Sequence, residues 1–259
     1  MKECRKGVLW EMALILLTVA ACLYSTGAGN IFGAKVDWSS QHSVFPEYFR
    51  QQFYRTGQFF PEFALNIGGG QNIYNFSYYG LFSPVVLIGY LLPNVKMSDY
   101  MMVASIVCLA AAVIILYRWL KSREFTAAVS GMTALMFLFA GPMIYQSSHQ
   151  IMFVNYMPFL ILAFLFLDQI LDVRKAAKYR FRPHVGLVIS LFFCILHSFY
   201  FFPSCFTAWI LYIFHLLPHF LQNAEETIRK KLKHKIWWNY ILDVSIAVSM
   251  NMFLLLPTG

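Results

Sequence analysis

The residues best suited to chemistry follow the first apolar run, in the segment VDWSSQHSVFPEYF that begins at Val36. Asp37 is the first acid of this segment, and Gln41 follows it by four residues. A carboxylate at a membrane surface can act as a general base, taking a proton from an acceptor hydroxyl as it attacks an activated sugar. Capping a helix or pairing with Lys35 or an arginine is the alternative role. Both roles require Asp37 to be exposed near the membrane boundary.

Further polar residues in two segments have the side chains that a binding site needs. Amide groups and ring faces of the kind that bind carbohydrate gather near Gly68–Gly70; they belong to Asn66, Gln71, Asn72, Tyr74, Asn75 and Tyr78. Ordinary loop polarity is the alternative for this cluster, and a simple turn is the alternative for the glycines. His149 and Asn155 lie in a later polar segment, where His149 either pairs with a phosphate leaving group or is a solvated loop histidine.

Composition indicates that the bilayer is the solvent for most of the chain. Hydrophobic residues make up 59% of the 259 residues and charged residues 12%, a balance typical of polytopic membrane proteins. Seven apolar runs are predicted to be spanning helices; they cover residues 8–28, 98–117, 125–145, 151–171, 185–200, 201–218 and 240–256. The five cysteines lack disulfide or metal-ligand spacing and are expected to be packing residues.

The distribution of basic residues predicts the orientation, because cytoplasmic loops of membrane proteins carry an excess of Lys and Arg. If segment 79–93 dips into the membrane without crossing it, 16 of the 20 basic residues fall on one side. Residues 29–97 then form one external loop, the N-terminus is cytoplasmic, and the first helix is kept as a span rather than cleaved as a signal peptide. Short basic loops beside apolar helices exclude a nucleic-acid-binding protein.

Several residues at the ends of the predicted spans have expected roles. His197 and Tyr200 lie at the outer end of the fifth predicted span. They could line the same opening at the membrane surface as His149 and Asn155 of the second external loop. At the cytoplasmic end of the fourth span, Asp168 is expected to form a local charge pair with Arg174 and Lys175.

The external loop is expected to contain an amphipathic helix at the membrane interface, because aromatic residues recur with helical spacing from Phe45 to Phe53. Ser43 can cap this helix. Arg50 lies on its other side and, with Arg55, is available to bind a lipid phosphate at this depth.

Three segments together resemble the N-terminal part of YfhO-type bacterial membrane proteins, which are GT-C class glycosyltransferases; the segments are VDWSSQHSVFPEYF, GGGQNIYNFSYYGLFSPVVLIGYLLP and FAGPMIYQSSHQIMFVNYMPFLIL. The resemblance implies an all-α polytopic GT-C module over residues 1–259, with about seven transmembrane helices and a catalytic external loop of interfacial jaw helices. It also implies that Asp37 is the catalytic acid of the family and that Gln41 matches the glutamine that follows it.

The function that the resemblance implies is transfer of a sugar from a polyprenyl-phosphate donor to a cell-envelope polymer such as teichoic acid, at a bacterial cell membrane. Substrate binding would involve Gln41, Arg50, Asn72, Tyr74, His149 and Asn155. No cofactor is implied beyond the lipid-linked donor, and His149 in place of an acid leaves divalent-metal use open. A transporter or flippase of an amphiphilic lipid-linked substrate is the alternative. Because the family is longer, the chain is expected to be an N-terminal fragment.

Overall fold

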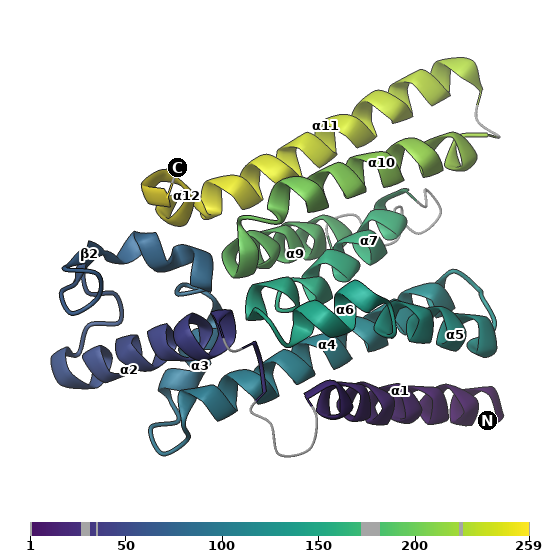
Figure 1. Cartoon of the computed structure of the whole chain (residues 1–259). Coiled ribbons are helices and arrows are strands. Elements are labelled where there is room, and N and C mark those ends of the chain that lie inside the picture. Colours follow the sequence, from purple (N-terminus) through teal and green to yellow (C-terminus); the bar gives the residue numbers. More distant parts are fainter. Residues whose placement is uncertain (1, 27–31, 35, 172–181, 223–224, 259) are drawn as a thin grey trace.

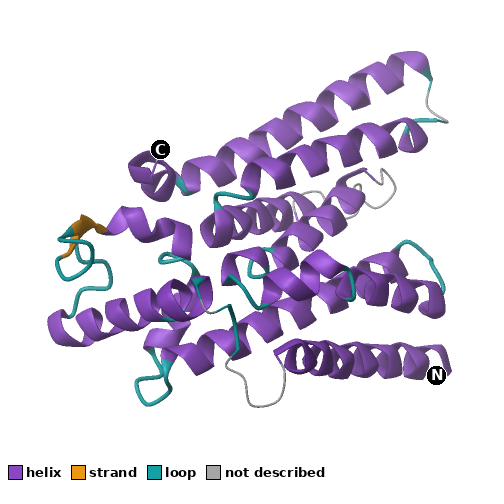
Figure 2. Cartoon of the chain, in the orientation of Figure 1, coloured by secondary structure: helices purple, strands orange, loops and turns teal. Residues whose placement is uncertain are grey.

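The chain folds almost entirely into helices (Figures 1 and 2). The computed structural model describes residues 2–26, 32–34, 36–171, 182–222 and 225–258. In chain order, its elements are α1 (Lys2–Thr26), η1 (Trp38–His42), α2 (Val44–Thr56), β1 (Phe63–Ala64), β2 (Gln71–Asn72), η2 (Ile73–Tyr79), α3 (Pro84–Tyr90), α4 (Met97–Ser122), α5 (Ala127–Leu138), α6 (Gly141–Ser147), η3 (Ile151–Phe153), α7 (Met157–Leu171), α9 (Arg182–Ser198), α10 (Phe202–Phe220), α11 (Glu226–Met250) and α12 (Met252–Thr258).

Within the described residues, three helical segments are long and apolar enough to cross a membrane: Lys6–Thr26, Met97–Ser122 and Ile151–Leu171. Two bent pairs raise the number to five if each is one span: α5 with α6, bent by 56°, and α11 with α12, bent by 70°. The prediction of an all-α polytopic membrane protein is therefore confirmed. Each predicted run is helical, two of them as bent pairs of helices. Among the described residues, three to five segments meet the length and hydropathy criteria for a span, because α9 has only 17 residues and α10 does not meet these criteria.

The break between α5 and α6 follows from Pro142, which lies in the first turn of α6. Proline lacks the N–H that a continuing helix needs, and it disfavours helical backbone at the preceding residue. The chain therefore stops one helix at Leu138 and restarts the next at Gly141.

The segment 79–93 contains only the short helix α3, of seven residues. At 1.5 Å per residue, this helix is about 10 Å long, far short of the roughly 30 Å of hydrocarbon in a bilayer. Its length therefore agrees with the prediction that this segment does not cross.

Three apolar clusters hold the elements together. The first joins η1, α2, η2 and α3 to the beginning of α4, with Trp38, Phe49 and Tyr90 among its buried members. The second lies between α7, α9, α10 and α11 around Trp209. The third packs α1 against α4 and α5. The segment between α1 and α4 is thus packed onto the helical bundle through the first cluster.

The glycine-rich segment Gly68–Gly70 is the turn of a small hairpin between β1 and β2 (Figure 2). All three glycines have positive φ, from +58° to +98°, a region that other residues rarely adopt. The geometry therefore matches the simple turn that the sequence left as one alternative.

Polar contacts tie the helices together near the basic segments. Asp168 accepts hydrogen bonds from Trp119 Nε1 at 2.7 Å, Arg123 Nη1 at 2.8 Å and the Tyr212 hydroxyl, so it joins α4, α7 and α10. The ion-pair partner of Asp168 is Arg123, which follows α4, and the sequence had predicted Arg174 and Lys175 for this role. Arg174 and Lys175 lie outside the described residues. The sequence missed this pair because it joins residues 45 positions apart.

Four cysteines have the predicted character, because they are free and buried: Cys22, Cys108, Cys194 and Cys205.

Candidate functional site

Asp37 lies where the segment between α1 and α4 meets the loop between α6 and α7. The amide of Ala34 donates to the Ser148 carbonyl at 3.1 Å, and the Ala34 carbonyl accepts from the Trp38 amide at 3.1 Å. These bonds fix the backbone on one side of Asp37. Gly33 is required here, because its φ is +97° and an added Cβ would lie 2.0 Å from the ring of Trp38. The packing of Trp38 against this glycine leaves Asp37 half-buried at the start of η1.

The Asp37 carboxylate has a neutral partner from the loop between α6 and α7. Gln150 Nε2 donates a hydrogen bond to Asp37 Oδ2 at 3.1 Å. The two arginines of the first loop are engaged elsewhere: Arg50 pairs with Glu47, and Arg55 donates to a glutamine of its own helix. The predicted alternative of an Asp37–arginine pair is therefore not formed by Arg50 or Arg55, and Lys35 lies outside the described residues.

His42, which sequence reasoning missed, lies fully buried on the same helical turn as Asp37. Neither ring nitrogen has a hydrogen-bond partner among the described residues. Burial lowers the pKa of His42 from 6.5 to about 4, although the nearby Asp37 charge opposes this shift. His42 is therefore uncharged at neutral pH, and it does not neutralise the carboxylate.

Three tyrosines extend the neighbourhood of Asp37. Burial raises the pKa of both Tyr78 and Tyr79, and the Asp37 charge adds to both shifts, so the carboxylate is within electrostatic reach of the two hydroxyls. The ring of Tyr200, at the turn after α9, meets Tyr78 edge to face with centroids 5.5 Å apart. The structure thus brings Tyr200 against Tyr78, whereas His197, which was expected to line an opening together with Tyr200, is buried.

A family model described as bacterial membrane protein YfhO matches residues 12–259 of this chain. The chain belongs to the YfhO family. No curated protein and no solved structure matches it. Family membership confirms the expected relationship, and it establishes a membrane protein rather than a particular reaction or substrate.

The other residues expected at the site of this YfhO-family chain fall into two groups. Some lie near Asp37, and the others make contacts that stabilise the fold. Gln41 is half-buried on η1, the turn that Asp37 begins, and His149 precedes Gln150 in the chain. His149 stacks on the ring of Tyr145, and its Nδ1 lies 2.6 Å from the Tyr145 carbonyl oxygen.

The remaining expected residues make contacts that hold the fold. Arg50 is buried and donates to the carbonyls of Leu92 at 2.8 Å and Val95 at 2.6 Å. Asn72 accepts from the Tyr74 amide at the start of η2. The ring of Tyr74 lies parallel to that of Phe82, with centroids 5.4 Å apart.

Asn155 is completely buried, although the sequence placed it at a loop mouth. Its Nδ2 donates to the His197 carbonyl at 3.3 Å, and its Oδ1 has no partner among the described residues. A Cβ added at Gly80 would lie 3.9 Å from Asn155 Nδ2, so the amide packs closely against the turn after η2. The position beneath that turn explains the burial.

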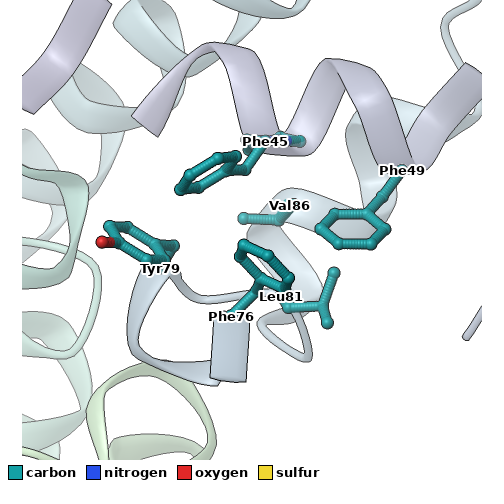
Figure 3. A pocket seen from close by; sticks show the side chains of 7 residues that line it. Phe45, Phe49, Phe76, Tyr79, Leu81 and Val86 are labelled. Carbon is teal, nitrogen blue, oxygen red and sulfur yellow. The ribbon is translucent and has the colours of Figure 1, made fainter. Parts of the chain in front are cut away.

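A narrow apolar groove adjoins this region between α2 and the η2–α3 segment (Figure 3). Its empty volume is about 170 Å³, and its lining residues are Phe45, Pro46, Phe49, Phe76, Tyr79, Leu81 and Val86. Figure 3 shows the rings of Phe45 and Tyr79 on one side of the groove, and these rings meet edge to face at 4.8 Å. Tyr79 therefore connects the groove to the surroundings of Asp37, since its ring also lies 5.3 Å from that of His42.

Within the part of the chain that the structure describes, no group of three His, Cys, Asp or Glu side chains is placed to hold a metal ion.

Proposed function

We propose that this chain is a membrane glycosyltransferase module that moves a sugar from a polyprenyl-phosphate donor to a cell-envelope polymer. The observation that carries the proposal is a half-buried carboxylate, Asp37, at the junction of two external loops, with a neutral amide as its hydrogen-bond partner. Membership of the YfhO family supports a membrane location. The reaction would take place on the outer face of a bacterial cell membrane, with the N-terminus in the cytoplasm.

In the proposed reaction, Asp37 is the general base. The acceptor hydroxyl gives its proton to the carboxylate while its oxygen bonds to the anomeric carbon of the donor sugar. The bond between that carbon and the phosphate oxygen breaks, and the polyprenyl phosphate leaves with the electron pair. Among the described residues, the hydrogen-bond partner of Asp37 is a neutral amide rather than a cation, which suits a carboxylate that must accept a proton.

The other groups of the site have proposed binding roles. Gln41 lies four residues after Asp37 in the chain. His149 directly precedes Gln150, whose side chain bonds to Asp37. In its imidazolium form, His149 can keep Nδ1 on the Tyr145 carbonyl and offer Nε2 to the leaving phosphate. Tyr78 and Tyr200 present aromatic rings on which a sugar can lie, and Tyr200 is 60% exposed.

A transporter or flippase is the rival function, and one buried ionisable pair bears on it. His184 Nδ1 and Asp243 Oδ2 are 2.6 Å apart between α9 and α11. Transporters place such groups near the midplane of the membrane, on broken helices. His184 is the third residue of α9, so the pair lies at one end of that helix and ties it to α11. This location favours a structural role for the pair over a transport site.

Replacement of Asp37 by Asn in the chromosomal gene tests the proposal. We expect transfer of radiolabelled sugar from the polyprenyl-phosphate pool to envelope polymer to fall by at least about 100-fold in isolated membranes, because the base is lost. Asp99→Asn is the matched control, since Asp99 is an exposed acid at the start of α4 and should leave transfer unchanged. Normal transfer by the Asp37→Asn protein at normal abundance would reject the proposed function and favour the transporter.

A further inference from the structure

We infer that Gln150 is a positioning residue that orients the Asp37 carboxylate for proton transfer. This inference rests on the proposed function. The Gln150 Nε2 to Asp37 Oδ2 bond joins residues 113 positions apart, so it connects the two external loops at the point of the proposed chemistry. The sequence gives no spacing signal for such a contact, because helical periodicity relates only near neighbours.

The backbone of Gln150 is held in place on both sides. Two residues before it, the Ser148 carbonyl accepts the bond from the Ala34 amide of the first loop. Directly after it, Ile151 is fully buried in the cluster that joins the external loop to α4. The Gln150 carbonyl also accepts from the Phe153 amide at 3.2 Å, which closes the turn of η3. The backbone that carries the Gln150 amide group is therefore held in place beside Asp37.

The chemistry of this contact fits orientation rather than neutralisation. The amide donates through Nε2, because the alternative orientation would set its oxygen against a carboxylate oxygen. Gln150 Oε1 is buried without a partner among the described residues. The bond occupies Asp37 Oδ2, so Oδ1 is the oxygen that can receive the proton of the acceptor. In general, a hydrogen bond to a carboxylate oxygen favours the charged form, so a pH–rate profile can report the loss of such a bond.

Other titratable groups around Asp37 come from several elements. They are His42 on η1, Tyr78 and Tyr79 on η2, Tyr200 after α9 and His149 beside Gln150. His42 is uncharged above about pH 4, and the raised pKa values of Tyr78 and Tyr79 keep both hydroxyls protonated at neutral pH. Because His42 gains a proton near pH 4, in the range where a carboxylate titrates, its contribution to the pH profile needs a separate control.

The test compares Gln150→Leu, Gln150→Glu and Gln150→Asn in the full chain, by pH–rate profiles of sugar transfer from radiolabelled polyprenyl-phosphate sugar in membranes. We expect kcat to fall by about 10- to 100-fold in Gln150→Leu, with the KM for the acceptor within about twofold, because a charged hydrogen bond is lost. The acid limb of the profile should move to higher pH in Gln150→Leu and further in Gln150→Glu, where a like charge opposes ionisation.

Two further results separate the alternatives. Gln150→Glu keeps the size of the side chain, so a shifted acid limb in this variant cannot be explained by misfolding, and His42→Phe should leave the acid limb in place. Lower activity with an unmoved acid limb in both Gln150→Leu and Gln150→Glu would give Gln150 a merely structural role and overturn the inference. A normal rate in Gln150→Leu beside an inactive Asp37→Asn protein would overturn the inference alone, whereas full activity of Asp37→Asn would remove the proposed function itself.

Discussion

At the scale of single residues, the burial of His42 makes the stability of the fold depend on pH. Its pKa in the folded protein is about 4, against 6.5 when it is exposed. Below pH 6.5 the unfolded chain takes up a proton that the folded chain does not, so stability should fall between about pH 6.5 and pH 4 and then level off. The loss can reach about 3 kcal/mol, since one pKa unit corresponds to about 1.4 kcal/mol.

The prediction is that His42→Phe removes most of this acid sensitivity, because the ring stays apolar at every pH. Thermal unfolding in detergent at pH 7 and pH 4.5 measures it, and His149→Phe serves as the control on a residue that is not fully buried. Equal loss of stability in the wild-type and His42→Phe proteins would show that another group titrates.

The turn that carries Asp37 explains what the sequence could predict of the site and what it could not. The resemblance to the YfhO family directed attention to Gln41, four residues after Asp37, a spacing that would share one face of an α-helix. The Ser43 amide instead bonds to the Trp38 carbonyl at 3.0 Å, five residues back, so η1 is a π-helical turn. In such a turn, residues five apart lie on one face, and the fifth residue after Asp37 is His42. Gln150 was beyond prediction for a different reason, because its contact depends on how two loops fold together.

At the scale of elements, Arg50 shows how tertiary contacts decide the role of an exposed-looking position. The sequence placed it on the polar side of α2, available to a lipid phosphate. In the structure its guanidinium donates to Glu47 and to the carbonyls of Leu92 and Val95, and thereby fixes α2 to the segment between α3 and α4. The amphipathic helix was predictable from periodicity, while the partner of its buried arginine was not.

We predict that Arg50→Gln lowers the free energy of unfolding by about 2–3 kcal/mol, because several charge-assisted hydrogen bonds of a buried side chain are lost. Arg55→Gln, at an exposed position on the same helix, should change it by less than about 0.5 kcal/mol. Thermal unfolding and limited proteolysis near Leu92 measure the difference. A large fall in sugar transfer with unchanged stability would instead support the phosphate-binding role.

At the scale of the whole molecule, two independent patterns agree. The basic clusters of the sequence predict that four segments share one side of the membrane. Figure 1 shows the N-terminus, the start of α5 and the start of α11 at one end of the bundle, and α2, β2 and α12 at the other. Hydropathy and charge could predict this arrangement because each helix is placed by its own apolar length and its own flanking charges, without reference to its neighbours. The bends of α5–α6 and α11–α12 were not predicted, and they leave three to five segments that meet the criteria for a span.

Labelling of single cysteines tests the orientation on which the outer-face reaction depends. Cys22, Cys108, Cys194 and Cys205 are buried, so a Cys4→Ser background suffices for labelling of introduced thiols. We expect Asn66→Cys and Lys96→Cys to react with a membrane-impermeant maleimide in intact bacterial cells, because both side chains are solvent-exposed and belong to the segment proposed to be external. Lys231→Cys, on the exposed basic start of α11, should react only after permeabilisation. Labelling of Asn66→Cys but not Lys96→Cys from outside would mean that the segment around α3 crosses the membrane after all. Labelling of Lys231→Cys alone would invert the molecule and place Asp37 where no extracytoplasmic acceptor could reach it.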